Sequence, residues 1–314
     1  KAYALVGASA AIAAAVGPLL GGFITTYLSW RVGFALEVVI IAVVLFNIRR
    51  VRDAPYTGDH HVDTIGAVLS VFGMGGIVLS ILVWQEGGEA VGALLLIGVI
   101  AMALLATWLV RRKRNGKPAL IDPTLFGSKI FRLGITNQML QQIALGGMMI
   151  VLPIYLQMVL EYSAMLSGLS IAPLSLSMFG VALLAGKRAG TRRPSGIIRF
   201  GFALLVLGLV VLIPIVPRAD SGWWLLIPLL IAGSGLGLMV SQLNNYTLSP
   251  ISEERVSEAA GVNSAAGSFG LSFGLAFAGA IMLATLSFAF TDLAESSAVL
   301  SPSEQQQVAQ ALDE

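Results

Sequence analysis

The sequence predicts an all-α polytopic membrane protein. Of its 314 residues, 56% are hydrophobic and only 11% are charged, and the mean hydropathy is +0.86. Soluble domains carry about 25% charged residues, so this chain has too few charged groups to cover a soluble fold. Its apolar residues fall in long stretches, and an α-helix needs about 20 such residues to cross a bilayer.

Nine stretches meet this requirement, and each is expected to be a transmembrane helix. Lipid cannot hydrogen-bond to an open backbone, so every span must satisfy its own peptide groups. Only the second stretch carries a charged residue in its body, Glu37. The predicted spans are residues 2–28, 32–48, 64–85, 90–110, 133–160, 164–186, 197–217, 223–246 and 260–290.

The basic residues predict the orientation of these spans. All 19 Lys and Arg residues except Arg31 and Arg218 lie at alternate ends of successive spans. The positive-inside rule places the basic side in the cytoplasm, which predicts a multi-pass protein of the plasma membrane. The polar, acidic tail 291–314 is then extracellular. The predicted cytoplasmic loops are residues 49–63, 111–132, 187–199 and 249–258.

Several motifs follow one another in a fixed order along the spans. They are "AVGPLLGG" at 15–22, "LSWRVGF" at 28–34, "VDTIGAVLS" at 62–70, "LPIYLQ" at 152–157, "SGLSIAP" at 167–173 and "GVNSAAGSFGLSFGLAFAGAI" at 261–281. In this order they resemble motifs of helices five to thirteen in the fourteen-helix drug:proton antiporter branch of the major facilitator superfamily. The first resembles its antiporter motif GxxxGPxxGG, and the second its W-R-x-x-F sequence.

Two positions depart from the family pattern. Ala13 stands where the antiporter motif has its first glycine, and Glu37, Val38 and Val39 stand where the family usually has Asn and then Val-Pro. The resemblance still implies a partial major facilitator fold with nine visible transmembrane helices. The second departure weakens any transfer of sixth-helix roles to this chain.

The resemblance also implies how the chain is divided. Residues 1–52 would be the last two helices of the amino-terminal half, and residues 53–115 two linker helices between the halves. Residues 116–290 would be five helices of the carboxy-terminal half, and 291–314 an extracellular segment before a last helix. Helices one to four and fourteen are expected to lie outside this sequence, and the chain alone is not expected to transport.

The first span places a proline and glycines inside an apolar helix, at Gly17, Pro18, Gly21 and Gly22. Proline costs a helix interior about 3 kcal/mol and glycine about 1 kcal/mol relative to alanine. The spacing of Gly17 and Gly21 lets another helix approach closely, and Pro18 permits a bend. We expect a packing and bending point near the outer face; ordinary tight helix packing is the alternative.

Glu37 is the candidate for proton coupling. An ionisable residue inside a membrane span is a functional hypothesis by default. At 1.5 Å per residue from Arg31, it lies roughly 9 Å below the outer surface. The alternative is a shallow carboxylate that reaches water or pairs with Arg31.

Polar side chains on two spans predict a substrate cavity. On the fifth span four amides share a sector of about 140°, together with Met148 and Tyr155. A lipid-facing amide stripe would be costly, and Met suits an adaptable pocket. Hydrogen bonds between helices are the alternative in both spans. The candidates are Asn137, Gln138, Gln141, Gln142, Met148 and Tyr155 on the fifth span and Ser234, Ser241 and Asn245 on the eighth.

Other functions lack the residues that they require. The two histidines, His60 and His61, are adjacent in a polar loop, where Asp63 is expected to cap the third span, and no metal site, phosphate loop or catalytic triad is visible. An enzyme and an ATP-driven pump are therefore disfavoured. The expected function is a monomeric secondary transporter without cofactor or nucleic-acid partner, which exports lipophilic or amphipathic molecules against protons. Export of an endogenous lipid or metabolite, and a non-transporting lipid-binding protein, remain alternatives.

Overall fold

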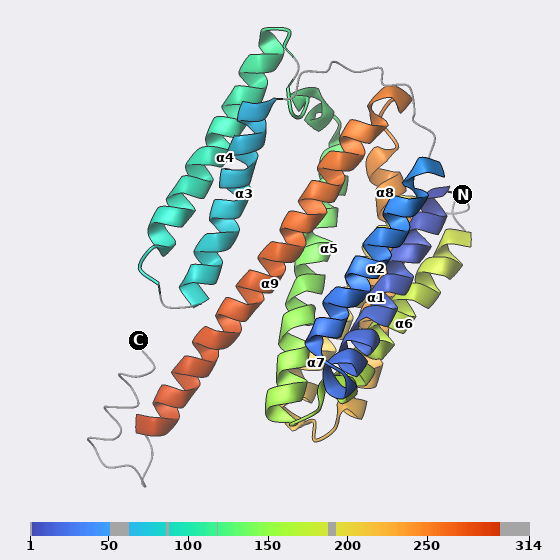
Figure 1. The fold of residues 1–314 in the computed structure, drawn as a ribbon, viewed down its shortest axis with the longest axis vertical. Helices are drawn as coiled ribbons and strands as arrows, with labels where there is room; N and C mark the ends of the chain where they lie inside the picture. Colours follow the sequence, from blue (N-terminus) through green and yellow to red (C-terminus); the bar gives the residue numbers. More distant parts are fainter. Residues whose placement is uncertain (1, 51–62, 86–87, 118, 188–192, 296–314) are drawn as a thin grey trace. The chain divides into compact units, whose positions relative to one another are not determined.

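A computed structural model describes residues 2–50, 63–85, 88–117, 119–187 and 193–295, and every regular element in these ranges is helical (Figure 1). Eight of the helices in these ranges are long and apolar enough to cross a membrane, and the helix at the first of the nine predicted spans, Ala2–Tyr27, is not one of these eight. The predicted all-α membrane fold is therefore confirmed.

The chain forms two compact units, each built from two segments. The first unit comprises Lys1–Asp59 and Leu152–Ser249, and the second comprises His60–Val151 and Pro250–Glu314. The division of the chain at residues 52, 115 and 290 stays a prediction.

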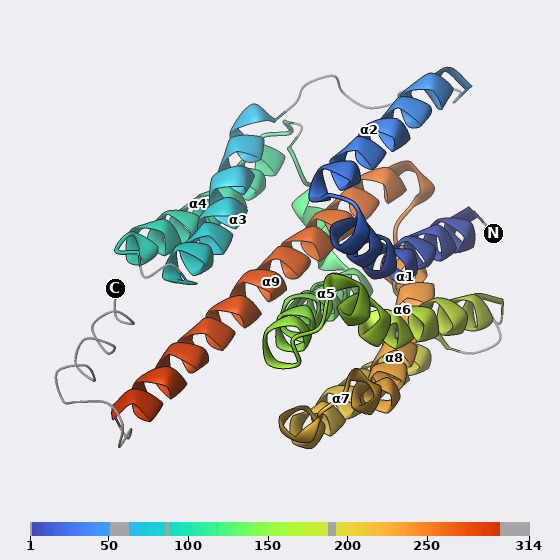
Figure 2. The same cartoon turned by 60° about the horizontal axis from the view of Figure 1, so that its bottom comes forward.

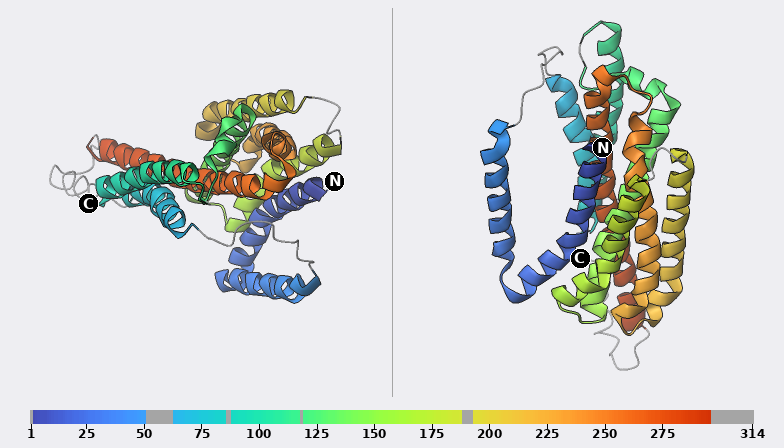
Figure 3. Two further views of the ribbon diagram at one scale, coloured as in Figure 1. Left: turned by 90° about the horizontal axis from the view of Figure 1, so that it is seen from above. Right: turned by 90° about the vertical axis from the view of Figure 1, so that its right-hand side faces the viewer.

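In the first unit, α8 is the central helix, packed against both α6 and α7 (Figure 2). Its Leu229, Ala232, Leu236 and Met239 have no exposed surface. By contrast α2 has no buried residue among those described, and Figure 3 shows it standing apart from α6, α7 and α8. The elements of this unit are α1 (Ala2–Tyr27), α2 (Trp30–Asn47), η1 (Ile48–Arg50), the π-helical turn η3 (Tyr155–Val159), α6 (Ala164–Lys187), α7 (Pro194–Ile215), η4 (Val216–Arg218), η5 (Gly222–Leu225) and α8 (Leu226–Leu248).

The second unit contains a tight helical hairpin, α3–α4, and the helices α5 and α9. Backbone meets backbone in the hairpin, because a Cβ built on Gly76 would lie 2.9 Å from Gly98 Cα. A similar approach joins α5 to α9, where a Cβ on Gly270 would lie 2.6 Å from the Met139 carbonyl oxygen. The elements are α3 (Thr64–Gln85), α4 (Val91–Arg114), η2 (Pro123–Gly127), α5 (Lys129–Ile154, within this unit as far as Val151), η6 (Glu253–Arg255) and α9 (Val256–Glu295).

Two spans differ in detail from the prediction. The fifth, expected at 133–160, begins four residues earlier and ends in the π-helical turn η3 just after Pro153. Proline has no backbone N–H to donate, so the regular hydrogen-bond pattern of the α-helix is already interrupted near this end of the span. The ninth, expected at 260–290, is a helix of 40 residues.

Candidate functional site

The Gly/Pro-rich stretch of α1 is a contact point with α6 in the first unit. A Cβ built on Gly168 of α6 would lie 2.5 Å from the Pro18 carbonyl oxygen, and one on Gly22 would lie 2.6 Å from the Ala164 carbonyl oxygen. Side chains do not tolerate such distances, so glycine lets the two backbones touch. The Met165 N–H also donates to Thr26 Oγ1 at 3.0 Å.

The contact between α1 and α6 is made at other positions of α1 than the predicted pair, Gly17 and Gly21. No heavy atom of another described helix lies within 4 Å of a Cβ built on Gly17 or Gly21. Among the described helices, the close approach lies at Pro18 and Gly22 of the same motif and not at Gly17 and Gly21, whose role stays a prediction. Pro18 and Gly22 have the same four-residue spacing but lie about 100° further around the helix, and that face meets α6.

Glu37 lies on α2 with its side chain exposed and forms no ion pair with any residue that the structure describes. Arg31, the alternative partner, instead places its guanidinium over the Trp30 ring, 5.4 Å from the ring centroid. The pairing of these two residues is not made.

The amides of α5 lie in two environments. The side chain of Gln138 faces α9, with its Nε2 atom 3.1 Å from a Cβ built on Gly267. Gln141 is only 3% exposed, and the buried carboxamide oxygens of Gln141 and Gln142 accept no hydrogen bond from the described residues. A buried acceptor without a partner costs about 1–3 kcal/mol. These two oxygens can therefore accept a hydrogen bond from water or a ligand.

The other cavity candidates lie in several different environments. The Tyr155 hydroxyl donates to the carbonyl oxygens of Val216, at 2.8 Å, and Ala219, at 3.2 Å, and so joins η3 to η4 within the first unit. Met148 is buried, whereas Asn137 is half-buried and Asn245 is exposed. The hydroxyls of Ser234 and Ser241 donate to carbonyl oxygens of their own helix, at 2.7 and 2.8 Å. The shared cavity stays a prediction.

Gln242 is a buried polar residue of α8 that the sequence interpretation did not select. It is 2% exposed, and its Nε2 atom donates to the Ala185 carbonyl oxygen of α6 at 3.5 Å. The signal was its position next to Ser241 in a membrane span. This contact is a hydrogen bond between helices.

Asp63 is a buried carboxylate with several hydrogen-bond donors around it. Its oxygens accept hydrogen bonds from the backbone N–H of Gly66 and of Leu120, both at 3.0 Å, and from Trp108 Nε1 at 3.1 Å. Arg112 Nη1 lies 3.5 Å away. Burial alone would raise the pKa of Asp63, but these donors and the Arg112 charge outweigh it and hold the pKa below 3.8. The predicted cap of the third span is confirmed, and it also binds α4 and the following linker.

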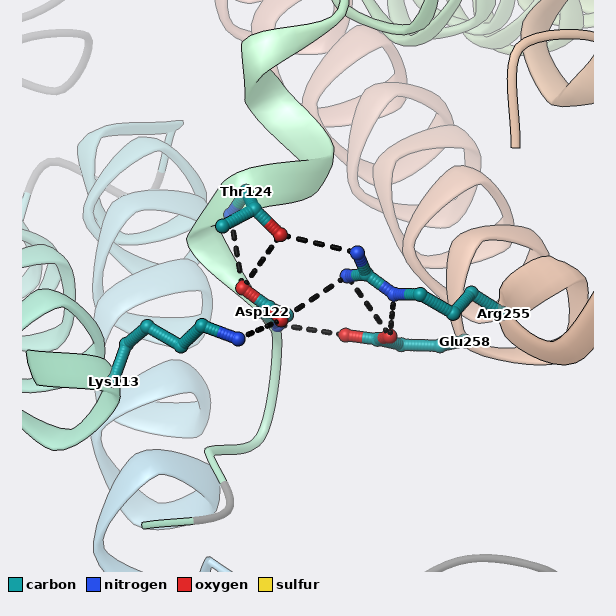
Figure 4. Close-up of polar contacts among 5 residues, drawn as sticks. All are labelled: Lys113, Asp122, Thr124, Arg255 and Glu258. Atoms are coloured by element: carbon teal, nitrogen blue, oxygen red, sulfur yellow. Dashed lines mark hydrogen bonds and ion pairs between the residues drawn. The ribbon is translucent and has the colours of Figure 1, made fainter. Parts of the chain in front are cut away.

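A second polar cluster surrounds Asp122 on the same linker (Figure 4). Lys113 Nζ lies 2.6 Å from Asp122 Oδ2, and Arg255 Nη2 lies 3.3 Å from the same oxygen. The Asp122 N–H donates to Glu258 Oε1 at 2.7 Å, and Arg255 Nη1 donates to Thr124 Oγ1 at 3.0 Å. Burial would raise the pKa of Asp122, but Lys113, Thr124 and Arg255 lower it overall. The cluster joins the end of α4 to the start of α9.

Residues 119–127 thus form a strap held by two carboxylates. Asp63 binds the N–H of Leu120, and Glu258 binds the N–H of Asp122, two residues further along. Both anchors lie in the second unit, so the strap fastens the α3–α4 hairpin to the first turn of α9.

The described residues contain no group of three or more His, Cys, Asp and Glu able to hold a metal ion. His60, His61 and the tail from residue 296 lie outside the described ranges.

Comparison with known proteins gives the family. The model of the Major Facilitator Superfamily matches residues 61–275. The multidrug resistance protein Stp of Mycobacterium tuberculosis is 29% identical over 286 residues, which are 89% of this chain and 52% of Stp. The puromycin resistance protein pur8 of Streptomyces alboniger is 29% identical, over 84% of this chain and 53% of pur8. The probable transport protein HsrA of Haemophilus influenzae is 25% identical over 90% of this chain and 60% of HsrA. The chain spans about half the length of the curated relatives it matches.

Proposed function

The chain belongs to the Major Facilitator Superfamily, a family of membrane transporters and not of enzymes, and from this premise we propose that it is part of a proton-coupled exporter of lipophilic or amphipathic small molecules. Such a transporter exposes its binding site alternately to the two sides of the membrane. The names of Stp and pur8 link those two proteins to drug resistance, and they support a toxic or foreign substrate here.

The observation that carries the substrate site is the pair of buried acceptors on α5. Gln141 and Gln142 offer carboxamide oxygens that accept no hydrogen bond from the described residues, with the buried Met148 two turns further along. Acceptors without a fixed charge favour a substrate that brings N–H or O–H donors on an apolar body. A flexible Met neighbour suits substrates of several shapes.

The α1–α6 contact supports the alternating-access part of the proposal. At Gly22 and Gly168 the helices meet through backbone atoms. Small residues at such contacts let helices pack closely, and Pro18 weakens one turn of α1. This arrangement suits two helices that shift against each other during transport.

Replacing the buried acceptor tests the substrate site. We expect Gln141→Leu in the complete protein to weaken binding of substrates with N–H donors by about twofold to tenfold, because one net hydrogen bond is worth about 0.5–1.5 kcal/mol. Substrates without donors should bind as before. Binding and export are measured in proteoliposomes against a panel of both kinds of substrate.

Gln157→Leu is the matched control, since Gln157 is exposed on η3. An unchanged substrate profile in Gln141→Leu, or an equal change in both variants, would contradict a substrate site at Gln141.

Proton coupling is tested at Glu37. We expect Glu37→Gln to continue to move substrate down its own gradient but to lose the acceleration by an imposed pH gradient, because the amide cannot carry a proton. Substrate-induced proton flux into liposomes, followed with a pH-sensitive dye, measures this. Glu89→Gln, at an exposed position of the α3–α4 loop, is the control. If transport by Glu37→Gln is accelerated by the pH gradient as much as transport by the wild type, Glu37 does not couple transport to protons.

A further inference from the structure

Some basic residues at the end of α4 pair with carboxylates, and others do not. Four consecutive basic residues, Arg111 to Arg114, end the helix, and Lys117 follows. The structure ties two of them to carboxylates, Arg112 to Asp63 at 3.5 Å and Lys113 to Asp122 at 2.6 Å. Arg111, Arg114 and Lys117 are exposed and pair with no carboxylate in the described ranges. Three cations at this end are therefore not neutralised by the described part of the protein.

Helix geometry separates the paired from the unpaired residues. Successive positions are about 100° apart, so Arg111 and Arg114 lie only about 60° from each other. The buried residues of α4 (Gly98, Ala101, Leu105 and Leu109) lie on the opposite side, which is also the side of Arg112. Arg112, which pairs with Asp63, thus lies on the buried side of α4, and Lys113, which pairs with Asp122, lies at the edge of that side. Arg111 and Arg114 lie on the opposite, exposed side.

An exposed apolar face leads directly to these two arginines. Leu96 is 60% exposed, Ile100 is 48% exposed and Leu104 is 52% exposed. With Thr107 these positions recur every three or four residues, and the next two on the same face are Arg111 and Arg114. In a membrane span, such a face meets lipid chains, and arginines at its end reach the headgroup layer.

We propose that Arg111 and Arg114, with Lys117, bind the phosphate of an anionic phospholipid whose acyl chains lie along the exposed face of α4. Guanidinium groups match phosphate oxygens with two parallel hydrogen bonds, and they are only weakly hydrated. The apolar face supplies the chain contacts, and the three unneutralised charges favour an anionic over a zwitterionic headgroup. The lipid is a ligand of the α3–α4 hairpin and is distinct from the transported substrate.

Native mass spectrometry of the complete protein in mild detergent tests this site. The protein is titrated with phosphatidylglycerol or with phosphatidylcholine of the same acyl chains. We expect the wild type to retain phosphatidylglycerol in preference. Arg111→Gln/Arg114→Gln should weaken that binding roughly 30-fold, at about fivefold for each charge near an anionic group, and leave phosphatidylcholine binding unchanged.

Arg31→Gln/Arg218→Gln is the charge-matched control. It removes the same charge at the other ends of the spans, where Arg31 stacks on Trp30 and Arg218 donates to the Pro214 carbonyl oxygen at 2.8 Å. We expect it to keep the preference for phosphatidylglycerol. Equal binding of both lipids by the wild type overturns the proposal, whether the face is bare or covered by another segment or a second copy. An equal loss in both double variants also overturns it. Neither result depends on transport.

Discussion

Asp63→Asn is expected to destabilise the α3–α4 hairpin by about 3–5 kcal/mol, the cost of removing one partner from a buried ion pair. The new carboxamide would present N–H groups to the N–H donors of Gly66, Leu120 and Trp108, so at least one buried donor loses its acceptor. Arg112 would lose its counter-charge as well. The measurement is hydrogen exchange at the amides of Gly66 and Leu120, together with thermal unfolding of the purified protein.

Asp220→Asn is the matched control for this substitution. Asp220 is exposed, and its Oδ1 accepts one hydrogen bond from Trp224 Nε1 at 2.9 Å, which the carboxamide oxygen of the variant can also accept. We expect little change in unfolding temperature. Similar exchange rates at Leu120 in Asp63→Asn and in the wild type would show that the carboxylate does not hold the strap.

The same carboxylate gives a pH dependence of known sign. The folded pKa of Asp63 lies below its usual value of 3.8, so the unfolded chain binds more protons in that range. Its contribution to stability is complete above about pH 5 and is lost as the pH falls through the folded pKa. Asp63→Asn should therefore unfold with a shallower dependence on pH below 4 than the wild type does.

Hydropathy predicts the helices of this fold well because each span must satisfy its own backbone in lipid. Seven of the predicted spans need only small shifts at their ends. The exceptions are local: α5 ends in a π-helical turn after Pro153, and α9 extends from Val256 to Glu295, past both ends of the apolar stretch into polar residues. Helix ends depend on neighbouring contacts, which composition does not contain.

The polar sites were predictable only where one helix contains the whole signal. The amide stripe around Gln141 is visible in a single span, and burial of Gln141 agrees with its interior position. The hydrogen bond from the Asp122 N–H to Glu258 joins residues 136 positions apart in the sequence. No local sequence pattern predicts it. Similarly, periodicity finds the glycines of α1 but cannot tell which of two adjacent rows, Gly17–Gly21 or Pro18–Gly22, meets α6.

Gly168→Ala is expected to lower the transport rate of the complete protein by at least fivefold. Its new methyl group would lie 2.5 Å from the Pro18 carbonyl oxygen, a backbone atom that cannot turn aside as a side chain would. The helices must separate, and overpacking of this kind costs about 1–3 kcal/mol, or about 5- to 150-fold in an equilibrium. If a conformation of the transport cycle requires this close contact, the variant populates that conformation less often, and the transport rate falls. Initial export rates in proteoliposomes measure the effect.

Gly180→Ala on the same helix separates this contact from helix propensity. A Cβ built on Gly180 has no heavy atom of another described element within 4 Å, so the substitution adds a methyl group in open space. Alanine favours a helix over glycine by about 1 kcal/mol, and both variants gain this equally. Only Gly168→Ala also forces α1 away from α6, so a difference in rate between the variants reports the contact. Equal export by Gly168→Ala, Gly180→Ala and the wild type would mean that transport does not need α1 and α6 this close together.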